Sequence, residues 1–143
     1  MKIKQLSLFI ENKPGHLNKI CADMKKHNIN ITTLSLADTK DFGILRLIVA
    51  HPLEAKAILE EEGHIVNMTE VVAIEVPHKP GGLAKILEIT KKANINIEYM
   101  YGFAGNTSTD SAALIFRFDN PDKAIKELEA AGISGIENIS MFV

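Results

Sequence analysis

The sequence predicts an α+β protein of two similar units, and three observations favour this. The chain contains a long internal repeat, strand-like and helix-like hydrophobic patterns follow one another in the same order in each copy, and no linker separates the copies. Lys13–Gly15 and Asn28–Ile31 return 66 positions later as Lys79–Gly81 and Asn94–Ile97. After a three-residue insertion the match resumes at a spacing of 69. Whatever structure the first copy adopts, the second copy is expected to repeat it.

The two copies, residues 1–69 and 70–143, are expected to be two domains that lie side by side. Each has about 70 residues, close to the smallest size at which a single hydrophobic core is stable. We therefore expect the copies to pack on each other. Only about two residues, Thr69 and Glu70, separate the last expected strand of the first copy from the first expected strand of the second. The two sheets could therefore join into one sheet of about eight strands.

Each copy opens with a strand and a helix. Apolar and polar residues alternate over 5–10 and again over 72–76, which is typical of strands. Pro-Gly then interrupts each copy. In the first copy Leu17, Ile20, Cys21 and Met24 follow at helical spacing, and the second copy repeats this pattern. The single cysteine, Cys21, excludes an internal disulfide and is predicted to be a buried thiol.

Two more strands, a second helix and a last strand complete each copy. Asn28 and Asn94 are expected to end the first helices. The remaining predicted elements are second strands running to about Asp38 and Ala104, third strands at Gly43–Ala50 and Ala112–Asp119, helices from Pro52 to Gly63 and from Pro121 to Gly132, and last strands at Ile65–Met68 and Ile136–Phe142.

The polar and small residues 105–110 are predicted to form an exposed hairpin loop. The resulting order, βαββαβ twice, is the ferredoxin-like arrangement, in which two helices cover one face of an antiparallel sheet.

Composition indicates a folded cytoplasmic protein. Hydrophobic residues make up 46% and charged residues 24% of the chain, close to ordinary globular usage. A net charge of −2 gives no electrostatic footprint for nucleic acid or an anionic membrane. No apolar run is long enough for a membrane span and no signal-peptide core is present. The five histidines show no metal-ligand spacing, so neither a metal nor a cofactor is expected.

The loops carry a family resemblance. Glu11–Leu17, where a strand meets Pro-Gly and an amphipathic helix, together with Asn28–Ile31, resembles the ACT domain, a small regulatory module that binds amino acids. Pro77–Leu83 with Asn94–Ile97 resembles it as well, so the resemblance covers essentially the whole chain. It is similar to stand-alone tandem ACT proteins, which implies an allosteric amino-acid sensor that acts on another protein.

A ligand site is expected at the Pro-Gly loops. Free backbone N–H groups and the positive end of a helix dipole follow Gly15 and Gly81, and glycine permits close approach, which together suit a carboxylate. The resemblance implies a ligand between this loop and the second strand of a neighbouring domain, near Leu34–Asp38 or Tyr99–Ala104, with Asp38 beside an α-ammonium group. Asn12, replaced by His78 in the second copy, favours the first loop if only one binds.

The candidate ligand-binding residues are Asn12, Lys13, Pro14, Gly15, His16, Leu17, Leu36, Asp38, His78, Pro80, Gly81, Gly82, Leu83, Tyr99, Tyr101 and Phe103.

Plainer roles remain open for several of these residues. The glycines can serve only as tight turns, Asn12 only as a turn former and Asp38 as a solvated strand end. Tyr99, Tyr101 and Phe103 alternate on one face of a predicted strand, opposite Met100. We expect this aromatic stripe to wall a pocket or to form a contact between chains.

Two other functional classes are disfavoured. Tyr101–Ala104 is similar to the aromatic signature of the RNA-recognition fold, but it lies on the second strand and lacks the leading basic residue. No nucleophile with its base and no paired carboxylates stand at matching positions of the copies, so no enzyme activity is expected. The expected partners are an amino acid, a second copy of the chain and an unidentified regulated protein. An assembly module without a ligand is the alternative.

Overall fold

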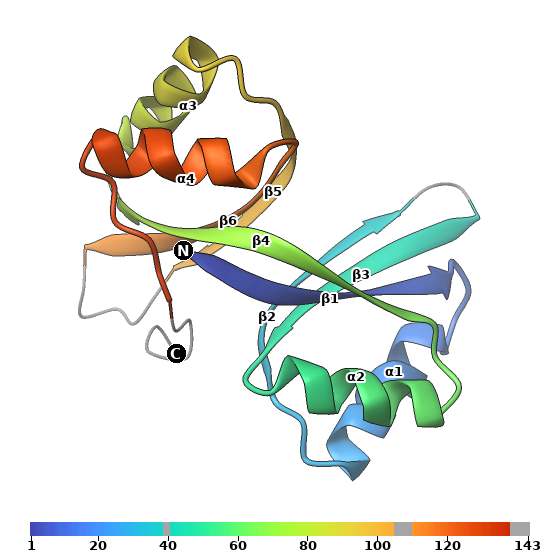
Figure 1. Ribbon diagram of the computed structural model, residues 1–143. Coiled ribbons are helices and arrows are strands. Elements are labelled where there is room, and N and C mark those ends of the chain that lie inside the picture. Colours follow the sequence, from blue (N-terminus) through green and yellow to red (C-terminus); the bar gives the residue numbers. More distant parts are fainter. Residues whose placement is uncertain (39–40, 105–109, 138–143) are drawn as a thin grey trace. The chain divides into compact units, whose positions relative to one another are not determined.

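The computed structural model describes residues 1–38, 41–104 and 110–137. Over this part of the chain, six strands and four helices follow one another in the order β1 α1 β2 β3 α2 β4 α3 β5 β6 α4 (Figure 1). They divide into two compact units. The first unit is Lys4–Thr69, and the second unit consists of Met1–Ile3 and the chain from Glu70 onward.

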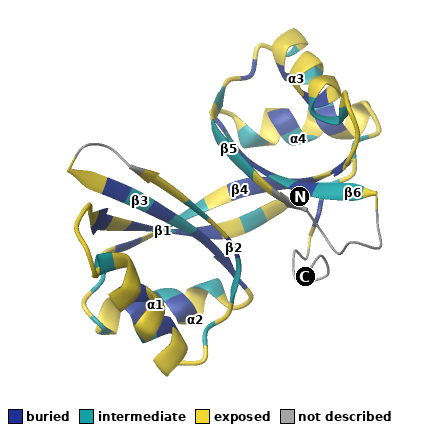
Figure 2. Ribbon diagram, turned by 180° about the vertical axis from the view of Figure 1, so that it is seen from behind, coloured by how far each residue is buried: buried dark blue, intermediate teal, exposed yellow. Residues whose placement is uncertain are grey.

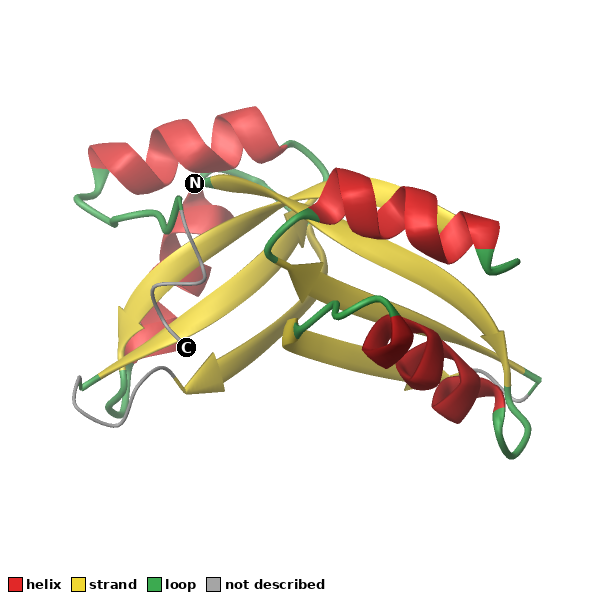
Figure 3. Ribbon diagram, turned by 90° about the horizontal axis from the view of Figure 1, so that it is seen from below, coloured by secondary structure: helices red, strands yellow, loops and turns green. Residues whose placement is uncertain are grey.

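The first unit has the predicted layers. Its elements are β1 (Lys2–Glu11), α1 (His16–Lys26), β2 (Ile31–Asp38), β3 (Phe42–Val49) and α2 (Pro52–Glu61). β3 pairs antiparallel with β1 on one side and with β2 on the other. Both helices cover the same face of these strands (Figures 1 and 3), as expected for a ferredoxin-like unit.

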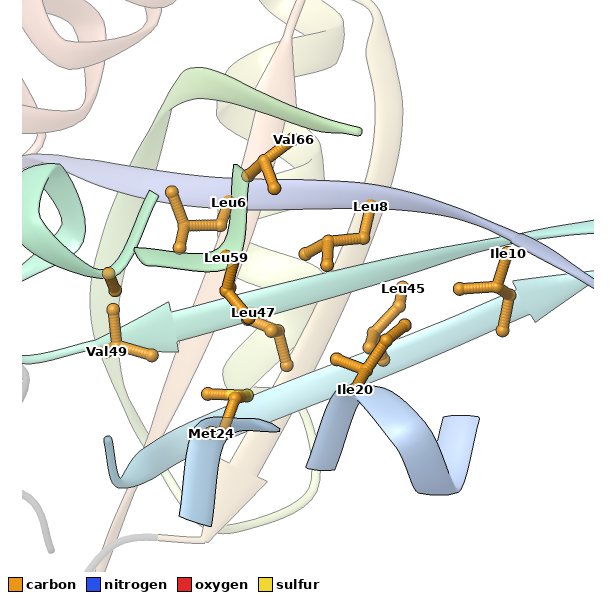
Figure 4. Close-up of a cluster of buried hydrophobic side chains, with 11 residues drawn as sticks. Leu6, Leu8, Ile10, Ile20, Met24, Leu45, Leu47, Val49, Leu59 and Val66 are labelled. Atoms are coloured by element: carbon orange, nitrogen blue, oxygen red, sulfur yellow. The ribbon is translucent and has the colours of Figure 1, made fainter. Parts of the chain in front are cut away.

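The core of the first unit lies between that face and the helices. Figure 4 shows the alternate residues of β1 and β3 pointing at the buried stripe of α1. The cluster contains Leu6, Leu8, Ile10, Ile20, Met24, Leu45, Leu47, Val49, Ala55, Leu59 and Val66. The alternate residues of the strands and the helically spaced residues of α1 thus pack in one core. The predicted strand and helix patterns are confirmed.

The second unit repeats this arrangement. Its elements are β4 (Val66–Pro77), α3 (Gly82–Lys92), β5 (Ile97–Ala104), β6 (Ser111–Phe118) and α4 (Pro121–Ala130). β6 pairs antiparallel with β4 and with β5. α3 and α4 cover one face of these strands (Figure 2), and Val72, Ile74 and Phe116 are buried in the core there. The alternate positions Ala73 and Ile115 are buried as well. Phe116 and Phe118 stack in this core with ring centroids 5.2 Å apart.

Asparagine ends the first helix of each unit, as predicted. Asn28 and Asn94 have φ values of 55° and 51°, in the left-handed region. The Ile29 N–H donates to the Met24 carbonyl over 2.9 Å, and the Asn28 N–H donates to the Lys25 carbonyl over 3.1 Å. These two bonds form a Schellman motif, which satisfies carbonyls at the helix end. The chain then turns directly into the next strand.

Several expectations were wrong. The last strand of the first copy and the first strand of the second are one strand, β4, so the described residues contain six strands and not about eight. The third strands, β3 and β6, by contrast agree within one residue with the bounds predicted as about Gly43–Ala50 and about Ala112–Asp119. Of the strand expected at Ile136–Phe142, residues 138–142 lie outside the described residues, as do 105–109 of the expected hairpin loop.

Cys21 is exposed, although a buried thiol was predicted. The face of α1 that enters the core is set by Ile20 and Met24, which are buried. Leu17 is 37% exposed. The apolar stripe is therefore wider than the surface that the sheet can cover, and its outer residues remain in solvent.

Candidate functional site

The loop between β1 and α1 has the backbone expected of a ligand loop. Gly15 precedes α1 with φ of +90°, a conformation that side chains disfavour, and no side chain caps the helix. The first N–H groups of a helix have no partner inside it. The first of them, the His16 N–H, donates to the Lys13 carbonyl of the loop over 3.5 Å. The positive end of the helix dipole lies at the same place.

The side chains of the first loop bind one another. The Glu11 N–H donates to His16 Nδ1 over 2.8 Å, and Lys13 Nζ lies 2.6 Å from Glu11 Oε2. The hydrogen bond from Lys13, and then its charge, lower the pKa of Glu11. His16, predicted to contact a ligand, thus has one ring nitrogen engaged by the loop itself.

A lysine one turn into α1 is also paired. Lys19 Nζ lies 2.8 Å from Asp23 Oδ2, and His64 Nε2 approaches the same oxygen to 2.7 Å. The hydrogen bond from Lys19 and then that from His64 lower the pKa of Asp23. The His64 side chain is only 6% exposed. The basic groups around the first loop therefore have acidic partners within the chain.

The loop between β4 and α3 has the same backbone and different side chains. The His78 N–H donates to the Asp110 carbonyl over 2.8 Å, as the Asn12 N–H does to Asp41 over 3.1 Å. Gly81 precedes α3 with φ of +88° and no side-chain cap. The matching positions of Glu11 and His16 are Pro77 and Gly82. Neither the donor N–H nor the imidazole acceptor of the first loop is present.

Two hollows flank this second loop, both lined entirely by residues of the second unit. The larger hollow has a volume of about 910 Å³ and is lined by Glu75, Val76, Pro77, Lys79, Pro80, Gly81, Gly82, Lys85, Ile86, Asp110, Ser111, Gly132, Ile133 and Ser134. The smaller hollow has a volume of about 540 Å³ and is lined by Val76, Pro77, His78, Lys79, Pro80, Leu83, Gly102, Ala112 and Leu114. The loop therefore separates two concave surfaces.

The predicted residues of the second loop line these hollows. His78 and Leu83 line the smaller one, Gly81 and Gly82 the larger one, and Pro80 lines both. The volumes fall in the range of small-molecule sites, about 300–1,000 Å³. Gly102 of β5, the second strand of the same unit, also lines the smaller hollow, whereas the second strand of a neighbouring domain was expected there.

Tyr99 and Tyr101 of the aromatic stripe are not among the lining residues of either hollow. Met100 pairs with Phe116 and packs against the core, so Tyr99 and Tyr101, in register with Arg117 and Ile115, lie on the other face of the sheet. Phe103 is opposite Ala113 in the register, and its side chain lies outside the described residues.

The candidates near the first loop are mostly exposed. Asn12, Pro14 and Leu17 lie at the surface, and Leu36 on β2 is 46% exposed beside Leu45. Asp38 ends β2 opposite Gly43, and its side chain is outside the described residues.

Sequence reasoning missed several lining residues. Lys85, Asp110 and Ser134 line the larger hollow, and Ala112 and Leu114 the smaller one. Lys85 stands four residues after Gly81 on a predicted helix, so helical spacing could have identified it. Ser134 comes from the far end of the unit, and no local pattern signals its position.

The protein family is identified by a model that matches both copies of the repeat. A family model described as an ACT domain pair matches residues 1–139. The chain belongs to the ACT domain family. No curated protein sequence matches it. Among the described residues, none of the helices is long and apolar enough to span a membrane, and no group of three His, Cys, Asp or Glu side chains could hold a metal ion.

Solved structures show the same ACT arrangement. Protein BT0572 from Bacteroides thetaiotaomicron is 41% identical, with a TM-score of 0.89 over 95% of this chain and 92% of that one. The ligand-free regulatory subunit of aspartate kinase from Thermus thermophilus is 18% identical, with a TM-score of 0.62 over 90% and 91% of the two chains. The corresponding subunit from Thermus flavus is 15% identical, with a TM-score of 0.60 over 92% and 95%. The last two likenesses concern the fold.

Proposed function

We propose that this protein is an amino-acid-binding regulatory protein of the cytoplasm without catalytic activity of its own. Membership of the ACT family supports a regulatory role. The observation that carries the proposal is the shared geometry of the two loops, in which a left-handed glycine precedes a helix with no side-chain cap. The first helical N–H, of His16 or Gly82, donates to the carbonyl of Lys13 or Lys79. The N–H groups that follow it have no partner inside the helix and suit a ligand.

The carboxylate of an amino acid fits such a helix start. Backbone N–H groups and the helix dipole stabilise a negative group there, and a glycine side chain places nothing in its way. An added Cβ at Gly15 or Gly81 would meet no atom within 4 Å, so the space above each turn is open. In the second unit the smaller hollow continues from this turn to β5 and offers an apolar wall for a side chain.

Regulation follows from differential affinity. An amino acid shifts a partner protein only if it binds two conformations of this protein unequally. We propose a homodimer as the regulatory form. The alternative, an assembly module without ligand, is favoured by the exposed apolar residues Leu34 and Leu36 on β2, which are 49% and 46% exposed.

A thermal-unfolding screen against the twenty amino acids, each at millimolar concentration, tests the proposal. A ligand at about 100 times its dissociation constant adds about 2.7 kcal/mol, which raises the midpoint by several degrees. Gly15→Val and Gly81→Val are expected to remove the shift from whichever loop binds, because a branched side chain covers the open amides.

Gly63→Val is the matched control. Gly63 has φ of +91° and open space around its Cβ position, so the substitution imposes the same backbone strain at a position outside both Pro-Gly loops. The ligand-induced shift should survive in this variant. If no amino acid shifts the midpoint of the unsubstituted protein, the proposal of an amino-acid sensor fails and the alternative, an assembly module without a ligand, is favoured.

A further inference from the structure

Two histidines lie against carboxylates where the end of α1 meets the chain that follows α2. His64 Nε2 lies 2.7 Å from Asp23 Oδ2, although the two residues are 41 positions apart. The His64 side chain is 6% exposed and that of Asp23 is 13% exposed. His27 Nε2 lies 2.6 Å from Glu62 Oε1. Both contacts join the first helix of this unit to the chain beyond its second helix.

Lysines share the same two carboxylates. Lys19 Nζ lies 2.8 Å from the Asp23 oxygen that His64 approaches, and Lys26 Nζ lies 2.6 Å from the Glu62 oxygen that His27 approaches. Hydrogen bonds from His27 and Lys26 lower the pKa of Glu62, and the charge of Asp23 acts on it in the opposite direction. The two pairs therefore form one cluster. Its charged and titratable members, among the described residues, are Lys19, Asp23, Lys26, His27, Glu62 and His64.

The contacts determine which histidine proton can be exchanged. Hydrogen bonds from Lys19 and His64 lower the pKa of Asp23, as those from His27 and Lys26 lower that of Glu62. Near neutral pH both carboxylates are ionised and can only accept hydrogen bonds. Each histidine therefore carries a proton on Nε2 in both of its charge states. The proton that it gains or loses is on Nδ1, so deprotonation keeps the hydrogen bond and removes its positive charge.

The second unit has none of these four groups. The positions equivalent to Asp23, His27, Glu62 and His64 are Ile89, Ala93, Ala131 and Ile133. Ile89, Ala93 and Ile133 pack against the core of that unit. The lysines are present in both copies, since Lys85 and Lys92 stand at the positions of Lys19 and Lys26. The copies thus differ in the groups that titrate at or below neutral pH and agree in the lysines.

We propose that this cluster is a proton-operated clamp on the first unit. With both imidazoles charged, two ion pairs hold the end of α1 to the chain after α2, and the clamp loosens as rising pH removes the Nδ1 protons. Histidine changes its charge between about pH 5 and pH 8. Asp23 and Glu62, whose pKa values are lowered from 3.8 and 4.5, stay ionised over this range. The clamp needs no ligand.

Amide hydrogen exchange and imidazole proton shifts of the full-length protein, followed from about pH 5.5 to about pH 8, test the clamp. Exchange rates are converted to protection factors, which removes the intrinsic effect of pH. A hydrogen bond to a charged group is stronger than a neutral one, so we expect the His27 and His64 amides to lose about fivefold in protection. The loss should follow the titration of the two imidazoles. The equivalent amides of the second unit, Ala93 and Ile133, should keep their protection.

Glutamine in place of both histidines separates charge from hydrogen bonding. The double variant His27→Gln, His64→Gln retains amide N–H donors that cannot become charged, so its protection at these positions should not change with pH. Asp23→Asn removes the opposite charge of one pair and should abolish the change at position 64. His51→Gln is the matched control, because it removes an exposed histidine at the other end of α2, and it should leave the change intact.

Three results would overturn the clamp. One is protection of the His27 and His64 amides that does not vary with pH. A second is an equal loss at Ala93 and Ile133, which would indicate a response of the whole molecule. The third is a loss of unchanged size in the double variant.

Discussion

At the scale of single residues, two linked differences separate the Pro-Gly loops. The first loop pairs the Glu11 N–H with His16, whereas the second has Pro77 and Gly82 at these positions. A Cβ on Gly82 would lie 2.3 Å from the Pro77 carbonyl oxygen. The second loop thus lacks both the imidazole acceptor and the N–H that it binds in the first loop. The Pro77 carbonyl lies so close to Gly82 that a side chain there would not fit.

Gly82→Ala is expected to destabilise the protein by about 1–3 kcal/mol, because the new methyl group meets a backbone oxygen that cannot move without its strand. Urea denaturation measures the change in free energy of unfolding. His16→Ala is the paired variant and should cost no more than about 1 kcal/mol, since the exposed Glu11 N–H can bind water. Equal costs would show that the close contact is relaxed in solution.

At the scale of elements, the two helix pairs are joined by different chemistry. In the first unit, Asp23 of α1 meets His64, and Glu62 Oε1 lies 2.6 Å from both His27 Nε2 and Lys26 Nζ. The second unit has apolar residues instead, and Ile89, Ala93 and Ile133 pack against its core. One helix pair is held partly by acid–base pairs, and the other by apolar contacts together with a hydrogen bond from Lys123 Nζ to the Ala93 carbonyl.

Acid should therefore loosen the first unit before the second. The hydrogen bond from His27, followed by that from Lys26, lowers the pKa of Glu62 from its ordinary value of 4.5, and the pKa of Asp23 also lies below its ordinary 3.8. As the pH falls below these ordinary values, the unfolded chain takes up protons first. The stabilisation is complete above them and is lost as the pH falls through the lower folded values.

Hydrogen exchange followed residue by residue across this acidic range would show the order of loss. Amides of α1 and β3 are expected to lose protection before those of α3 and β6. Asp23→Asn should weaken the acid response of the first unit, because the amide does not titrate. Simultaneous loss in both units, with no effect of this variant, would contradict the assignment to the helix pair.

At the scale of the whole molecule, the beginning of the chain belongs structurally to the second unit. The Met1 carbonyl accepts a hydrogen bond from the Ala73 N–H over 3.0 Å, and Lys2 Nζ lies 2.7 Å from Asp122. Met1 also packs against the core of the second unit. Sequence order and structural membership therefore differ at this point.

Deleting Met1–Ile3 is expected to accelerate amide exchange in the second unit, most of all at Ala73, which loses its acceptor. Lys2→Gln is the control. The pair with Asp122, which is 81% exposed, is screened by solvent and stabilises the protein little, so Ala73 should stay protected in this variant. If the deletion instead exposed β1 and β3 alone, the division of the chain would need revision.

Much of the fold was predictable because its signals are local. The alternation over residues 5–10, the Pro-Gly breaks and the asparagines after the helices each act within one turn or strand, and each is confirmed. The continuity of β4 was missed because Thr69 and Glu70 are polar, and polar residues can end a strand or continue it. Exposure of Cys21 depends on tertiary packing, which periodicity does not report.

The candidate site was less predictable. The loops and their glycines follow from sequence, but the larger hollow also depends on the path of the chain after α4, at Gly132–Ser134. The loss of ion pairs around Lys79 and Lys85 could have been read from the repeat, since Pro77 and Ile89 replace two carboxylates. That comparison needed the contacts of Lys13 and Lys19 to give it meaning.

Because β4 is one continuous strand that runs from the first copy into the second, it restricts the insertions and deletions that can occur between them. Val66 and Met68 enter the core of the first unit, and Val72, Ile74 and Val76 enter that of the second, so every one of them is even-numbered. Inserting or deleting one residue between Thr69 and Glu70 would put the two sets on opposite faces of a continuous strand. Length changes of an even number of residues would keep both sets on one face, so the spacing between the two copies is restricted by the pleat of β4.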